Sequence, residues 1–126
     1  MSFNTFGKIF RFTTWLLRAC GVHGRIKSPT YALLESYDLE GWPIWHFDFY
    51  RFEDPNEWHE AGMRDIFAGP GLKMAEWPEK VGNLLPEPDL EITLFAQADD
   101  SRLARLVGHT EQGQSWLAAV SSGASL

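Results

Sequence analysis

The sequence predicts a single α/β domain, and three observations support this prediction. The chain has 126 residues, 44% of them hydrophobic, with nine Phe, six Trp and three Tyr, which is enough to fill one core. Segments with helical periodicity alternate with β-prone segments along the chain. A short apolar run, 72–77, is bounded by Gly71 and Pro78, as a buried central strand often is. With no repeat or long linker, we expect one domain over residues 1–126.

Charge and cysteine content narrow the class of protein. The formal charge of −6 argues against a protein that holds a nucleic-acid backbone by general attraction, so contact with RNA is expected to be indirect. The single cysteine, Cys20, cannot form an internal disulfide and is expected to pack against apolar neighbours. The sequence has no continuous apolar span of about 18 residues and no cleavage site, which favours a soluble, cytoplasmic protein without a membrane partner.

The first half of the chain predicts a helix, a loop and a β-hairpin. Apolar residues from 10 to 20 follow a helical period, and Gly21 is well placed to end the helix; the stripe comprises Phe10, Trp15, Leu16, Ala19 and Cys20. Residues 24–30 are rich in helix breakers and small polar groups, which indicates a loop. Residues 31–37 and 43–49 favour strands, and the turn-forming residues 38–41 between them predict a hairpin.

The second half predicts a short helix, three strands and a last helix. Asp54 with Glu57 three residues later forms a helix-start box, and Pro55 suits the first helical position, so residues 55–61 should be helical. After strand 72–77, segments 89–96 and 102–109 alternate apolar and polar residues as paired strands do. Thr110 can cap a last helix, whose apolar residues are Trp116, Leu117 and Val120, and residues 121–126 should form a frayed tail.

Candidate chemistry lies at the ends of two predicted strands. Strand alternation places His46, Asp48 and Tyr50 on one face, which is either a structural polar face or a catalytic strand in which Asp48 orients an attacking water. Glu76 ends the apolar run, where a carboxylate can hold Mg²⁺ or simply face solvent. Residues 28–30 are either a mobile hydroxyl-bearing loop over a ligand or an ordinary turn.

Three segments together resemble the TsaE family in order and approximate spacing. They are Lys27-Ser28-Pro29-Thr30-Tyr31, His46-Phe47-Asp48-Phe49-Tyr50-Arg51 and Glu76-Trp77-Pro78-Glu79-Lys80. Supporting matches are Gly21-Val22-His23-Gly24, Asp54-Pro55, Gly62-Met63-Arg64-Asp65 and Leu84-Leu85-Pro86. The resemblance covers residues from about 16 to 109, whereas residues 1–15 diverge. Each match alone is weak, but the ordered set is specific.

The resemblance implies a P-loop NTPase-like three-layer sandwich with a mixed sheet. It also implies binding of ATP and Mg²⁺, and work with TsaB and TsaD in N6-threonylcarbamoyladenosine (t6A) modification, with tRNA met indirectly through that complex. In this chain Asp48 would be the catalytic carboxylate and Glu76 would help hold Mg²⁺, with Arg102 near the nucleotide. The switch-like loop would be Ser28, Pro29, Thr30 and Tyr31, and the supporting residues would be His46, Tyr50, Arg51 and Trp77.

The N-terminus departs from the family pattern. A phosphate-binding loop reads G-x-x-x-x-G-K-[ST], so that backbone N–H groups and a lysine meet the phosphates. Aligning on Gly7 and Lys8, the candidate phosphate-binding lysine, places Ser2 at the first glycine and Ile9 at the hydroxyl. Aligning on Thr13 instead places Phe6, Arg11 and Phe12 at the glycines and the lysine. We therefore expect an N-terminally incomplete domain, without an intact P-loop or its preceding strand.

Two main hypotheses for function follow from this departure. The chain is either an ATPase subunit supporting t6A modification, or a non-catalytic remnant of the family that does not bind ATP tightly and at most binds a partner. A metal-dependent hydrolase built on His46, Asp48 and Glu76 is a third, weaker hypothesis, because the sequence has no His-x-x-x-His or comparable ligand spacing.

Overall fold

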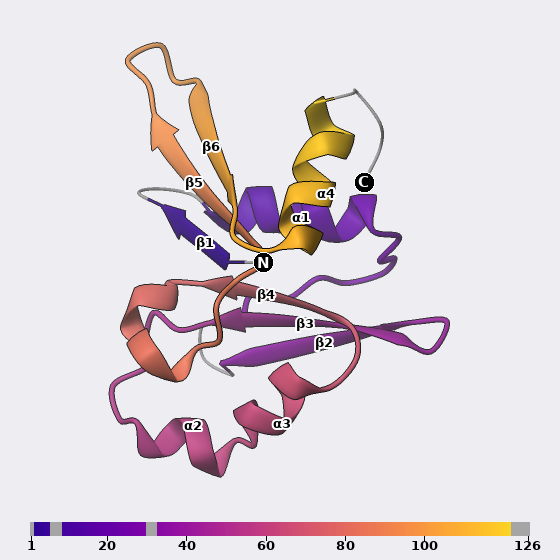
Figure 1. Ribbon diagram of the computed structural model, residues 1–126, viewed down its shortest axis with the longest axis vertical. Coiled ribbons are helices and arrows are strands. Elements are labelled where there is room, and N and C mark those ends of the chain that lie inside the picture. Colours follow the sequence, from indigo (N-terminus) through magenta and orange to yellow (C-terminus); the bar gives the residue numbers. More distant parts are fainter. Residues whose placement is uncertain (1, 6–8, 30–32, 122–126) are drawn as a thin grey trace.

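A six-stranded mixed sheet forms the middle layer of the molecule (Figure 1). The computed structural model describes residues 2–5, 9–29 and 33–121. The strands are β1 (Ser2–Thr5), β2 (Leu34–Leu39), β3 (Trp42–Asp48), β4 (Leu72–Glu76), β5 (Leu90–Ala96) and β6 (Arg102–Gly108). The helices are α1 (Ile9–Ala19), α2 (Asn56–Glu60), α3 (Met63–Ala68) and α4 (Glu111–Ser121), with 3-10 turns at Pro78–Lys80 and Gly82–Leu84. The predicted α/β fold with a mixed sheet is confirmed.

The strand order is β2-β3-β4-β1-β5-β6, so β1 lies in the centre of the sheet. It pairs in parallel with β4 on one side and with β5 on the other. The prediction that the strand before the phosphate-binding loop is missing is therefore wrong, because residues 2–5 form it. The four inner strands are parallel, whereas β2 and β6 run antiparallel at the two edges.

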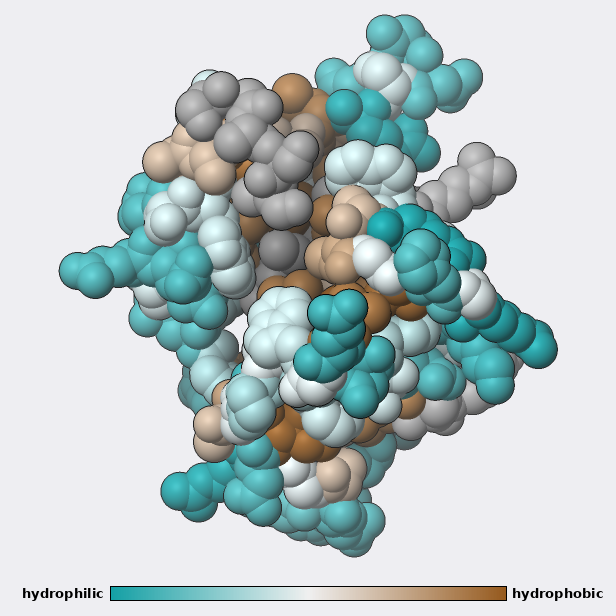
Figure 2. Space-filling view, turned by 90° about the vertical axis from the view of Figure 1, so that its right-hand side faces the viewer, coloured by the Kyte–Doolittle hydropathy of each residue, from teal (hydrophilic) through white to brown (hydrophobic). Residues whose placement is uncertain are grey.

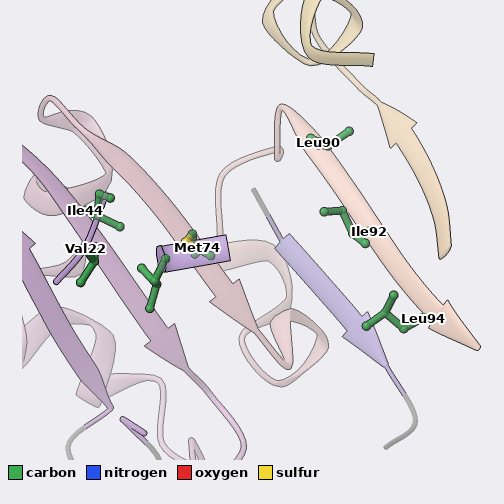
Figure 3. Packing of buried hydrophobic residues seen from close by; sticks show 7 residues of the cluster. Val22, Ile44, Met74, Leu90, Ile92 and Leu94 are labelled. Atoms are coloured by element: carbon green, nitrogen blue, oxygen red, sulfur yellow. The ribbon is translucent and has the colours of Figure 1, made fainter. Parts of the chain in front are cut away.

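Helices cover both faces of the sheet and define two cores. Helices α1 and α4 pack on one face, where the buried residues are Leu17, Val22, Ile44, Met74, Leu90, Ile92 and Leu94. Figure 3 shows the β5 members of this core on the strand next to β1. Segments α2 and α3 pack on the other face, over Phe47, Phe49, Phe52, Trp58, Met63, Ala75 and Val81. Strand alternation explains why Met74 and Ala75, adjacent in β4, belong to different cores.

The hairpin between β2 and β3 forms as predicted, with its turn at Glu40 and Gly41. Both residues have positive φ, 52° and 83°, which is the geometry of a two-residue hairpin turn that matches the strand twist. Asp38 supports the turn by accepting a hydrogen bond from the Gly41 N–H at 3.1 Å. Leu34 then lies opposite Phe47, and Glu35 opposite His46.

The hydrogen bonds predicted at the starts of two helices, α2 and α4, are observed. The Glu57 side chain accepts a hydrogen bond from the Asp54 N–H at 3.2 Å, as the helix-start box predicts for α2. Thr110 accepts one from the Gly113 N–H at 3.1 Å and so caps α4. Gly113 itself is required by packing, because a Cβ there would lie 1.7 Å from the Asp89 carbonyl oxygen.

The apolar stripe predicted for the first helix is partly wrong. Thr13 and Leu17 are fully buried, whereas Trp15 is 64% exposed and Cys20 is exposed just beyond the helix end. The expected packing role of Cys20 is therefore not observed. Helix α3 was not predicted, since its six residues are too few to show a period.

Candidate functional site

The candidate site lies at the carboxyl ends of the parallel strands β3 and β4. Asp48 is the last residue of β3 and Glu76 the last of β4, and the two are register partners. Both are buried, with 8% and 3% of their surface exposed. In open α/β sheets, ligands bind outside this edge, near the strand where the order of connections reverses. Here that strand is β1, next to β4.

Glu76 is held by two buried side chains from different elements. Its Oε2 atom lies 2.6 Å from His46 Nε2, and its Oε1 accepts a hydrogen bond from Thr13 Oγ1 at 3.2 Å. His46 and Thr13 are both fully buried. His46 reaches Glu76 because it precedes Asp48 by two residues on β3 and so shares its face. The result is a buried cluster that joins α1, β3 and β4.

Asp48 is positioned by the backbone around the end of β3. Its side chain accepts a hydrogen bond from the Tyr50 N–H at 3.0 Å, and its own N–H donates to the Leu33 carbonyl at 3.1 Å. The Phe49 N–H donates to the Glu76 carbonyl at 3.0 Å, which ties the two strand ends together. Tyr50 lies beyond the strand in a turn, so the prediction that it shares the strand face of His46 and Asp48 is wrong.

An aromatic pair lies directly beside Glu76. Trp77 follows Glu76 with φ of 57°, a backbone conformation that costs energy for a residue other than glycine and is often found near functional sites. Its ring centroid is 5.2 Å from that of Tyr50, which is half exposed. The Lys80 ammonium lies 5.8 Å from the Tyr50 ring centroid. Trp77 therefore packs against Tyr50, the residue whose N–H bonds the Asp48 side chain.

The other predicted site residues are scattered or outside the described part. Arg102 begins β6, which is separated from β4 by β1 and β5, and its guanidinium donates to the nearby carbonyls of Asp100 and Ser101. Ser28 and Arg51 are exposed, and Pro29 is buried. Lys8, Thr30 and Tyr31 lie outside the described residues. The structure thus brings together His46, Asp48, Glu76, Tyr50 and Trp77, but not Arg102.

Sequence reasoning missed Thr13 as a partner of Glu76. The two are 63 residues apart, so no local spacing could relate them. The available signal was a polar residue on the inward face of a helix, which needs a buried partner.

The sequence between β1 and α1, which lies outside the described residues, does not match a phosphate-binding loop. Strand β1 ends at Thr5 and α1 begins at Ile9, so only residues 6–8 connect them, with one glycine among them. A phosphate cradle needs a longer glycine-rich turn to direct several N–H groups inward. Both carboxylate oxygens of Glu76 already contact protein groups, and in the described part of the chain no three His, Cys, Asp or Glu residues cluster as metal ligands.

Fold and site together define the class as a three-layer α/β domain with a mixed sheet and with carboxylates at two adjacent strand ends. A crystal structure of Bacillus subtilis YdiB has the same fold, with a TM-score of 0.75 over 97% of this chain and 77% of that chain, at 21% identity.

A sequence profile described as "Threonylcarbamoyl adenosine biosynthesis protein TsaE" matches residues 6–105. Relatives named tRNA threonylcarbamoyladenosine biosynthesis protein TsaE include one from Haemophilus influenzae, 38% identical over 87% of this chain and 69% of its own length. Another, from Rickettsia bellii, is 36% identical over 79% of this chain and 69% of its own length. The chain belongs to the TsaE family, a family of t6A biosynthesis.

No helix in the described part of the chain is long and apolar enough to cross a membrane.

Proposed function

We propose that this chain acts in t6A modification as a TsaE-family domain that retains the carboxylate half of the nucleotide site and lacks the phosphate-binding half. It neither binds Mg-ATP tightly nor hydrolyses it alone, and contributes through contacts with TsaB and TsaD in the cytoplasm, so that tRNA is met only indirectly. The observation that carries this proposal is that only three residues separate the end of β1 at Thr5 from the start of α1 at Ile9, whereas Asp48 and Glu76 are retained at the ends of β3 and β4.

Energetic reasoning supports the loss of nucleotide affinity. In a P-loop, charge-assisted hydrogen bonds from backbone N–H groups and the lysine hold the phosphates, and Mg²⁺ is held largely through those same phosphates. The formal charge of the chain is −6, so general electrostatic attraction does not draw a polyphosphate to it.

Calorimetry with Mg-ATP tests the proposal. The purified 126-residue chain should show no saturable binding. A matched version whose first nine residues are replaced by a β-strand and a G-x-x-x-x-G-K-[ST] loop should bind and hydrolyse ATP. In that restored version Asp48→Asn should abolish hydrolysis without loss of binding. Saturable Mg-ATP binding by the original chain would favour the alternative, an ATPase subunit with a different phosphate-binding group.

The partner half of the proposal is tested separately. Immobilised chain should retain a purified TsaB–TsaD complex in the absence of nucleotide, and unrelated acidic domains of similar size should not. If the complex is retained only by the restored version with ATP, the proposed nucleotide-independent contact does not exist.

A further inference from the structure

The two edge strands of the sheet, β2 and β6, carry main-chain groups that face away from the molecule. In an antiparallel ladder, residues that direct N–H and C=O toward the neighbouring strand alternate with residues that direct them away. The His109 N–H donates to the Asp89 carbonyl one step beyond the end of β6, so the odd-numbered residues of β6 face β5. The residues whose main chain faces outward are therefore Arg102, Ala104 and Leu106. No described residue hydrogen-bonds to these main-chain groups.

Strand β2, at the other edge, is open in the same way. The Asp48 N–H donates to the Leu33 carbonyl one step before β2, so the odd-numbered residues of β2 face β3. The residues whose main chain faces outward are Leu34, Ser36 and Asp38. Within the described ranges, these outward N–H and C=O groups have no hydrogen-bond partner either. In Figure 1 the β2–β3 and β5–β6 hairpins both project from the body of the molecule, which leaves both edges accessible.

Strand β6 also exposes apolar side chains and an arginine on one face. Leu106 packs in the core under α1 and α4. Strand alternation therefore places three residues on the opposite face, called here the exposed face of β6, namely Leu103, Arg105 and Val107. Leu103 is 58% exposed and Val107 is 37% exposed. The Arg105 guanidinium lies 5.5 Å from the centroid of the Phe95 ring, and no carboxylate of the described residues forms an ion pair with it.

The composition of β6 is unusual for an unprotected edge. Natural sheets usually protect an edge strand with lysine, proline, a bulge or a short length, because an open ladder recruits other strands. Strand β6 has seven residues, contains neither lysine nor proline, and pairs with β5 without a bulge. The face of the molecule in Figure 2 is mostly hydrophilic, whereas the exposed face of β6 carries two apolar side chains. These features are typical of a strand that pairs with another strand.

We propose that β6 of one copy of this chain pairs antiparallel with β2 of a second copy. Both strands present outward main-chain groups at every second residue, so a single register can satisfy both sets. In that register, the opposite pairs are Arg102 with Asp38, Leu103 with Tyr37, Ala104 with Ser36, Arg105 with Glu35 and Leu106 with Leu34. Each arginine of β6 then faces a carboxylate of β2, and the exposed Leu103 faces an aromatic ring.

Charge separates this register from its alternatives. Strand β6 contains two arginines and no acidic residue, whereas β2 contains two acidic residues and no basic one. Pairing β6 with β6, or β2 with β2, therefore brings only like charges to the ladder. A shift of two residues between β6 and β2 places Glu35 opposite Leu103 or Val107 instead of Arg105. Of the antiparallel registers of these two strands, the proposed one alone pairs both arginines with carboxylates.

The interface is head-to-tail, because it uses β6 of one copy and β2 of the next. One β2 edge and one β6 edge stay free at the two ends of the assembly. The antiparallel pairing also reverses the inner strands from one copy to the next, since β6 and β2 each run antiparallel to their own inner neighbours. The copies are thus related by a half-turn with a shift along the sheet, which extends the assembly and does not close it.

Sedimentation velocity of the full 126-residue chain, without nucleotide, measures this association independently of the function proposed above. The average size should increase between about 10 μM and about 1 mM protein and should pass beyond a dimer. Hydrogen exchange at the higher concentration should slow in residues 34–38 and 102–106. A monomer at every concentration overturns the proposal, and so does protection confined to other segments.

Two charge-reversal variants identify the strands that pair. Arg105→Glu and Glu35→Arg should each weaken self-association about tenfold, because each places like charges opposite one another. An equimolar mixture of the two variants should associate again, since Arg105 of one variant faces Glu35 of the other and the two reversed residues also face each other. A variant that has lost its fold does not recover on mixing. A mixture that stays as dissociated as the separate variants contradicts the pairing of β6 with β2.

The matched controls reverse exposed charges away from both edges. Arg64→Glu in α3 and Glu60→Arg in α2 should each change self-association by less than about twofold. Equal effects of Arg105→Glu and Arg64→Glu mean that net charge, and not the β6 edge, controls the association, which overturns the proposal. Loss of association in Arg105→Glu with no change in Glu35→Arg also overturns it, because another strand then occupies β6.

Discussion

The carboxylate of Glu76 is hydrogen-bonded to two buried side chains, Thr13 of α1 and His46 of β3. A buried carboxylate needs such partners because removing a charge from water is costly. The same bonds mean that Glu76 holds α1 against the sheet, whatever else it does. Its structural role can therefore be measured without any ligand.

Glu76→Ala should lower the free energy of unfolding by about 3 kcal/mol, since it leaves two buried polar groups without an acceptor. Urea unfolding followed by tryptophan fluorescence measures this loss. Glu79→Ala, three residues later on the exposed surface, is the control and should change stability by less than about 0.5 kcal/mol. Equal unfolding midpoints for the two variants would contradict a stabilising role for the contacts of Glu76 with Thr13 and His46.

The reactivity of the Cys20 thiol offers a second test at the scale of single residues. The residue is exposed, yet desolvation by the surrounding protein raises the pKa of its thiol above the ordinary value. A raised pKa means less thiolate at pH 8, and the thiolate is the reactive form. Iodoacetamide should therefore modify Cys20 more slowly in the folded chain than in urea at pH 8, and the difference should shrink as pH rises. Faster reaction in the folded chain contradicts this.

The site residues could be predicted only in part from sequence. Asp48 and Glu76 were assigned to two predicted strands and, through the family resemblance, to one site, whereas the pairing of those two strands is known only from the structure. The contact between Glu76 and Thr13 did not follow, because it depends on how α1 crosses the sheet. Tyr50 was misplaced because alternation was extended one step beyond the true end of β3 at Asp48.

At the scale of elements, the β2–β3 hairpin depends on a turn with positive φ, and α4 depends on a close approach of its backbone to that of Asp89. The turn residue Glu40 has φ of 52°, which a branched or long side chain tolerates poorly, and Asn-Gly is the preferred pair for such a turn.

Glu40→Asn should therefore raise the free energy of unfolding by about 0.5 kcal/mol, measured as an increase in Tm. The control is Glu60→Asn, at the exposed end of α2, which should give no increase. A fall in Tm for Glu40→Asn contradicts the assigned turn.

Helix α4 should tolerate no side chain at Gly113, where the helix meets the Asp89 backbone. Gly113→Ala should destabilise by about 2 to 3 kcal/mol despite the better helix propensity of alanine, because the helix must move away. Ser115→Ala, exposed in the same helix, should be neutral or slightly stabilising. Thermal unfolding by circular dichroism compares the two, and similar Tm values contradict the close approach.

Elements that are stabilised by residues close together in the sequence could be predicted, whereas elements that depend on distant residues could not. The hairpin turn and the Thr110 cap are made by residues within a few positions of each other, so the sequence showed them directly. Strand β1, with the sequence Ser-Phe-Asn-Thr, has no apolar alternation of its own and becomes a strand only because β4 and β5 lie on either side.

At the scale of the molecule, β1 joins two halves of the sheet. The β2–β3–β4 half and the β5–β6 half meet through a strand that runs only from Ser2 to Thr5. Asn4→Pro removes a ladder N–H inside this strand, whereas Ser2→Pro lies at its first position, where proline is tolerated.

Asn4→Pro should therefore lower stability by about 3 kcal/mol and increase hydrogen exchange in both β4 and β5. Ser2→Pro should cause a much smaller loss of stability and a much smaller increase in hydrogen exchange. If exchange rises equally in the two variants, or only in β5, β1 does not connect the two halves as described.

The central position of β1 also sets an order of events during synthesis on the ribosome. Its partners, Ala75 and Glu76 in β4 and residues 91–94 in β5, leave the ribosome long after residues 2–5 do. Pairings so distant in sequence form slowly, because a long loop must close before they are stabilised. Strand β1 is made before both of its partners but is placed between them only after they emerge, and until then the nascent chain presents two incomplete half-sheets with open edges to its surroundings.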